Sequence, residues 1–108
     1  MSVQSILAPL IQNRVFTDEE TAVRELVQSY IQRQIERLRS EIQTLKDKYG
    51  MEYAQFNAYL HERSQVLIND SLTSEERRSL SQAVMEEEDD WLEWKARREL
   101  LDSWLGLL

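Results

Sequence analysis

Apolar residues recur along the first half of this 108-residue chain with the spacing of an α-helix. The longest such run extends from Thr17 to Gly50 and contains no proline or internal glycine. At its start, Thr17 as N-cap and Glu20 three residues later match a capping box. At its end, Gly50 can adopt the left-handed conformation that stops a helix. The pattern predicts one helix over about residues 18–48.

The apolar positions of this helix change period partway along. Its first half carries a broad stripe typical of packing inside a globular unit, made by Ala22, Val23, Leu26, Val27, Tyr30 and Ile31. From Ile31 onward, steps of four and three alternate, which is the seven-residue repeat of a helix that pairs with another helix. We therefore predict a dimer seam made by Ile31, Ile35, Leu38, Ile42, Leu45 and Tyr49.

Two arrangements satisfy this seam. Ile35 and Ile42 occupy the a positions of the repeat. Leu38 and Leu45 occupy its d positions, and isoleucine at a with leucine at d favours two parallel helices from two chains. Two heptads are too few for a free coiled coil, so an antiparallel hairpin with a later helix of the same chain is the alternative. The sequence does not fix the orientation of a dimer.

Shorter helices flank the long one, and they are expected over residues 5–13, 52–63, from 74 onward and 91–105. The alternative for the last two is a single continuous helix. Pro9 should lie in the first turn of its helix or bend it. We expect a break over residues 65–72, because a turn-like Asn-Asp-Ser sequence lies there. Thr73 with Glu76 forms a second capping box. We expect a bend or frayed stretch near Glu88, where five acidic residues in a row repel one another.

These elements predict an all-α fold: a dimeric helical bundle with a long central helix and flanking shorter helices. We divide it into an N-terminal helical dimerisation region, residues 1–65, and an acidic, tryptophan-rich helical region, residues 66–108. At 108 residues the two regions form one domain. A helical chain of this length often completes its core by dimerising.

Charge is concentrated in the second half of the chain. The net charge is −7, and residues 51–108 supply all of it, because residues 1–50 carry equal numbers of acidic and basic side chains. This sign opposes nonspecific binding to nucleic acid and favours a basic protein partner. The chain lacks cysteine, which excludes disulfides and fits a cytoplasmic location. No apolar run approaches the length of a membrane span, so we expect no membrane partner.

The sequence contains no catalytic constellation. His61 is the single histidine, and a lone histidine on a helix is more often a surface residue than a base. There is no glycine-rich phosphate loop, no pair of metal ligands at helical spacing and no nucleophile motif. The acidic run lacks the turn residues that would fold it around an ion. We predict a protein that is not an enzyme and that has no catalytic residues, cofactor or metal.

The last eighteen residues hold all three tryptophans. This terminal helix is apolar on both flanks, so it needs a groove in its own dimer or in another protein, and tryptophan is enriched at binding hot spots. The alternative is that these side chains complete the core of the chain itself. We predict that partner binding involves Glu86, Glu87, Glu88, Asp89, Asp90, Trp91, Glu93, Trp94, Leu101 and Trp104.

Several short motifs resemble those of small prokaryotic type II antitoxins of the ribbon-helix-helix class. The segment from Thr17 to Val27, Thr-Asp-Glu-Glu-Thr-Ala-Val-Arg-Glu-Leu-Val, resembles the start of the second helix in that family. Residues 7–11 and 13–16 look like the preceding helix and turn. The order of a long helix ending in Lys-Tyr-Gly-Met, a helix with Phe56 and an acidic Asp-Asp-Trp-Leu-Glu-Trp tail is also similar.

The resemblance implies an antitoxin whose acidic, tryptophan-rich end masks a basic toxin by occlusion. It departs from the family at the DNA-reading strand, because Met1 to Gln4 is too short to supply an alternating basic strand. That departure puts DNA binding in doubt, and we assign no DNA-contact residues. The competing hypothesis is a structural or adaptor homodimer that has no toxin partner and whose C-terminal helix closes its own core.

Overall fold

The chain forms four helices and no strand over the part that the computed structural model describes, residues 3–13, 18–69 and 71–108. The helices are α1 (Val3–Gln12), α2 (Glu19–Tyr49), α3 (Tyr53–Leu67) and α4 (Ser74–Leu105). The predicted all-α class is therefore confirmed. The molecule is a rod with principal extents of 74 × 25 × 18 Å.

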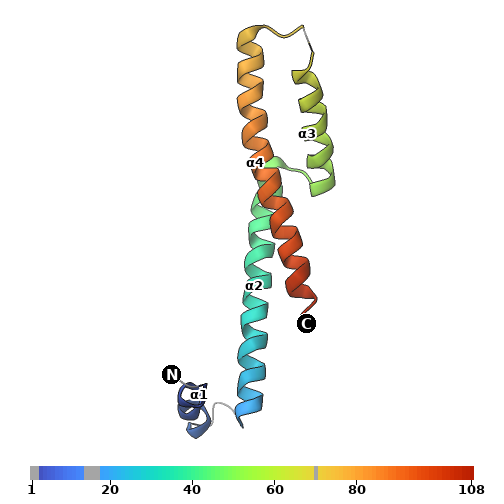
Figure 1. Cartoon of the computed structure of the whole chain (residues 1–108). Helices are drawn as coiled ribbons and strands as arrows, with labels where there is room; N and C mark the ends of the chain where they lie inside the picture. Colours follow the sequence, from blue (N-terminus) through green and yellow to red (C-terminus); the bar gives the residue numbers. More distant parts are fainter. Residues whose placement is uncertain (1–2, 14–17, 70) are drawn as a thin grey trace.

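Helices α2 and α3 follow each other in one direction, and α4 returns antiparallel along both of them (Figure 1). Side-chain contacts along α4 follow this course. Glu87 of α4 contacts α3, Asp90 contacts the last turn of α2, and Trp104 reaches back to Tyr30. The first half of α4 thus packs on α3 and its second half on α2, while α1 packs against the start of α2.

The ends of α2 lie within a residue of the predicted ones, but its N-cap differs. Asp18 is extended and its carboxylate accepts a hydrogen bond from the backbone N–H of Thr21 at 2.7 Å. The predicted cap, Thr17, lies outside the described residues. At the other end Gly50 has φ 62°, the left-handed conformation expected of it, and its N–H donates to the carbonyl of Lys46.

The second half of the chain differs from its prediction in two places. Helix α3 continues past Arg63 to Leu67, so the break is shorter than expected, and the division between residues 65 and 66 falls inside this helix. The last two predicted helices form one continuous helix, α4, with no frayed stretch at Glu88. Cations from α2 and α3 pair with two carboxylates of the acidic run, which reduces its self-repulsion. Thr73 caps α4 as predicted, accepting from the N–H of Glu76.

Helix α1 contains Pro9. This proline lies six residues after the first residue of the helix, beyond its first turn, and the helix ends three residues after it. The carbonyl of Pro9 accepts from the backbone N–H and the side-chain amide of Asn13. Leu7 and Ala22 are buried where α1 packs on α2.

The predicted seam is buried within the single chain. Ile31, Ile35, Leu38, Ile42 and Leu45 are at most 9% exposed, and Tyr49 is half-buried. Helix α4 packs antiparallel along this part of α2. The alternative of an intrachain antiparallel hairpin is therefore the observed arrangement of the isolated chain. No helix in the described part of the chain is long and apolar enough to cross a membrane.

Candidate protein-binding surfaces

The central core forms where α2, α3 and α4 meet, and its middle is aromatic. Trp94 and Phe56 are completely buried, with ring centroids 5.5 Å apart. Tyr49 stacks on Phe56 at a centroid distance of 4.2 Å, and Tyr53 contacts both Trp94 and Trp91. Stacked and edge-on aromatic pairs contribute beyond their buried area, by about 0.5–1.5 kcal/mol each. The tryptophan-rich segment thus completes the core of its own chain.

The acidic run of α4 divides between an inner and an outer face. On the inner side, the Glu87 carboxylate accepts from Arg63 Nε at 2.9 Å and from the Tyr59 hydroxyl at 3.3 Å. One turn further on, the Asp90 carboxylate accepts from Lys48 Nζ at 2.6 Å and from the Tyr49 hydroxyl. These two carboxylates therefore hold α4 to α3 and α2.

Burial and hydrogen bonding shift the pKa values of these inner groups. Burial disfavours ionisation of Asp90, but the hydrogen bonds from Lys48 and Tyr49 outweigh it and hold the pKa of Asp90 below its ordinary value. The hydrogen bond to Asp90 raises the pKa of Lys48. Burial raises the pKa of Tyr49, helped by its hydrogen bond to Asp90, and burial also raises that of Tyr59.

The other carboxylates of the run face solvent. Glu86, Glu88 and Asp89 are exposed and have no ion-pair partner within the described part of the chain. Glu93 is exposed, and its carboxylate Oε2 lies 3.7 Å from the guanidinium Nη1 of Arg97 on the same helix. The run therefore leaves three carboxylates on the surface of α4, and Glu93, just after the run, adds a fourth.

Two apolar side chains accompany these carboxylates. Met85 is 65% exposed and Leu92 is 55% exposed. Met85, Glu88, Asp89 and Leu92 follow steps of three, one and three, so they share one face of α4. We call this surface, with Glu86 and Glu93 at its edge, the outer face of α4. An exposed apolar pair within a field of negative charge is suited to a basic partner that also buries apolar surface.

A second exposed surface lies on the first half of α2. Val23, Leu26, Val27 and Tyr30 are 41–52% exposed, although their spacing marks a packing face. Helix α4 ends at Leu105, and its Trp104 contacts Tyr30 at a ring-centroid distance of 5.8 Å. We call these four residues the α2 stripe.

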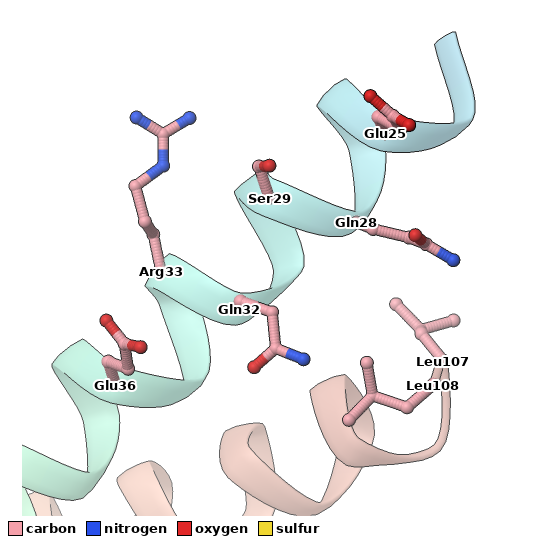
Figure 2. A pocket seen from close by; sticks show the side chains of 8 residues that line it. All are labelled: Glu25, Gln28, Ser29, Gln32, Arg33, Glu36, Leu107 and Leu108. Carbon is pink, nitrogen blue, oxygen red and sulfur yellow. The ribbon is translucent and has the colours of Figure 1, made fainter. Parts of the chain in front are cut away.

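An open groove lies on another side of α2, beside the end of α4. Figure 2 shows Gln28 and Gln32 of α2 directed toward Leu107 and Leu108, with Glu25, Ser29, Arg33 and Glu36 on the helix around them. Its polar side chains are exposed.

His61 is exposed on α3, as expected for a surface histidine. Over residues 3–13, 18–69 and 71–108 there is also no group of histidine, aspartate and glutamate side chains placed to hold a metal ion. Neither observation adds a chemical function to the binding surfaces.

The structure divides the ten residues that the sequence predicts for partner binding. Trp94 is fully buried in the chain's own core, and Trp91, Leu101 and Trp104 are half-buried. Glu87 and Asp90 face inward, whereas the outer face of α4 carries the remaining four: Glu86, Glu88, Asp89 and Glu93. Sequence reasoning did not select Met85 and Leu92, although their spacing of seven places both on one side of a helix.

Comparison with protein families, curated proteins and solved structures finds no significant match to this chain.

Proposed function

We propose that the protein is a non-enzymatic, antitoxin-like binding module that neutralises a basic partner by occlusion. The observation that supports this most is the division of the acidic run. Two of its five carboxylates stabilise the fold. The other three, Glu86, Glu88 and Asp89, remain exposed together with the nearby Glu93 and beside Met85 and Leu92. The lack of cysteine fits a reducing cytoplasm, which we propose as its compartment.

Occlusion on this surface would combine steering with burial. The exposed carboxylates attract a basic surface from a distance and set its orientation. Met85 and Leu92 then lose their contact with water, which supplies affinity at close range. Because the inner ion pairs and the aromatic core stay intact, α4 presents this surface without unfolding. A rigid surface loses less conformational entropy on binding than a disordered acidic tail.

The test uses the product of a small basic reading frame that adjoins the gene of this chain. We expect this product to arrest growth when expressed alone, and co-expression of the full chain to restore growth. Glu88→Lys with Asp89→Lys should lower the affinity of the purified pair at least tenfold. Glu36→Lys with Glu62→Lys is the matched control, because it changes the net charge equally at exposed sites on α2 and α3.

Equal loss of affinity in both double variants would indicate a general effect of net charge and contradict a site on α4. A purified neighbour that does not bind the chain, or the lack of any such basic reading frame, would refute the antitoxin-like proposal.

The second candidate function is a structural or adaptor homodimer. The observation that favours it is the α2 stripe, an apolar helix face that the rest of the chain leaves exposed. The two functions use different helices, so charge reversal on the outer face of α4 should leave self-association unchanged. A homodimer that forms without any binding to a basic protein would favour the adaptor function.

A further inference from the structure

We propose that two copies of this chain pair antiparallel through the α2 stripe, about a twofold axis that passes between residues 26 and 27. This inference rests on the homodimer of the second candidate function and does not depend on a basic partner. It differs from the seam predicted from the heptad pattern, because those side chains already pack within one chain.

The α2 stripe lies on a part of the helix that the chain does not cover. Every residue from Val23 to Tyr30 is exposed, whereas Ala22 and Ile31 on either side of this segment are buried. Helix α1 packs at the start of α2, and α4 reaches it only from the other end. A face with three aliphatic residues and a tyrosine at helical spacing is the kind that packs against another helix.

The spacing of the α2 stripe is self-complementary. Steps of three, one and three read the same in both directions, so a twofold axis at its centre brings apolar residues opposite apolar residues. At 3.6 residues per turn, Val23 of one copy then lies level with Tyr30 of the other. Around the axis, Leu26 meets Leu26 of the second copy on one flank and Val27 meets Val27 of the second copy on the other.

Charges at the ends of the stripe match the same register. In this register Glu19 of one copy lies level with residue 34 of the second. It therefore falls between Arg33 and Arg37 of the second copy, and all three side chains lie on the same flank of the helix pair. All three side chains are exposed, and none has an ion-pair partner within the described part of its own chain. A parallel pair would instead place each of these charges beside its own like charge.

The first experiment measures self-association of the full chain by sedimentation over a concentration series. We expect the natural sequence to dimerise, and Leu26→Glu with Val27→Glu to remain monomeric throughout. Gln28→Glu with Ser29→Glu adds the same charge on another side of α2, away from the stripe, so this control should still dimerise. Because all four residues are exposed, helicity by circular dichroism should be unchanged in both variants.

The second experiment tests the orientation in this cysteine-free chain. Leu26→Cys should form a disulfide-linked dimer on mild oxidation, since the two residues lie about 1.5 Å apart along the helix axis. Val23→Cys alone should not, because its two copies lie about 10 Å apart along the axis and a disulfide needs Cα atoms within about 7 Å. Val23→Cys mixed with Tyr30→Cys should form the mixed disulfide.

The natural chain remaining monomeric, or the Leu26→Glu, Val27→Glu variant still dimerising, would overturn the proposal. Cross-linking of Val23→Cys to itself would overturn the antiparallel register. These failures are distinguishable from failure of the antitoxin-like function, since that function is measured with a basic protein and with variants of α4.

Discussion

Replacing Trp94 by alanine tests whether the tryptophan-rich segment completes the core of its own chain. Trp94 is 0% exposed, and its ring centroid lies 5.5 Å from that of Phe56 and 5.7 Å from that of Tyr53. Removing a buried tryptophan costs about 3–5 kcal/mol. The indole N–H of Trp94 makes no hydrogen bond within the described residues, and this unpaired group offsets part of the stabilisation from packing. We therefore expect Trp94→Ala to lower the free energy of unfolding by about 3 kcal/mol, the lower end of that range.

That loss is a large part of the total stability of a domain this size, about 5–15 kcal/mol. Urea unfolding followed by circular dichroism measures it directly. With a slope of about 1–3 kcal/mol/M, the midpoint should fall by about 1–3 M. Leu92→Ala is the matched control on the same helix, and because Leu92 is half exposed its midpoint should move little. Equal midpoints for Trp94→Ala and the natural chain would refute the packing of Trp94 in this core.

Three further predictions follow from the contacts that hold the helices together. The pKa of Asp90 is lowered in the folded chain, so its stabilising effect is complete above about pH 4 and is lost as pH falls through the folded pKa. Asp90→Asn should lower the free energy of unfolding by about 1 kcal/mol at pH 7 and make the urea midpoint less dependent on acid pH. Gly50→Ala should lower the free energy of unfolding by about 1–2 kcal/mol in a thermal melt, because φ is 62° at this position. Gly106 has φ −66°, so Gly106→Ala should be nearly neutral. Equal effects of the two substitutions would contradict the left-handed turn at Gly50. A chain that ends at Val84 lacks Trp94 and should lose cooperative melting by calorimetry; a cooperative transition in that fragment would mean that the rest of α4 is not needed for folding.

The long helix could be predicted from the sequence because its signals are local. The uninterrupted apolar spacing and Gly50 predicted α2 to within a residue at each end. Thr73 likewise predicted the start of α4. Caps and stop signals act through the backbone groups of neighbouring residues, so they do not depend on the tertiary arrangement.

What covers each helix face could not be predicted in the same way. The spacing of three and then four residues between Ile35, Leu38 and Ile42 indicates that another helix packs on this face. A helix from a second chain and α4 of the same chain fit this spacing equally well. Within the acidic run of α4, Asp90 pairs with Lys48 and Glu87 with Arg63, and both partners lie far away in sequence. Tertiary ion pairs of this kind leave no local signal in the acidic run itself.

Fluorescence quenching of Trp94 tests most directly whether the tryptophan-rich segment completes the core of its own chain. A variant with Trp91→Phe and Trp104→Phe keeps Trp94 as the single tryptophan, and acrylamide quenching is then measured on the chain alone at low concentration. The account predicts strong protection of Trp94, far below the quenching of the urea-unfolded chain. Quenching equal to that of the unfolded chain would contradict it, because Trp94 would then be open to solvent until a partner arrived.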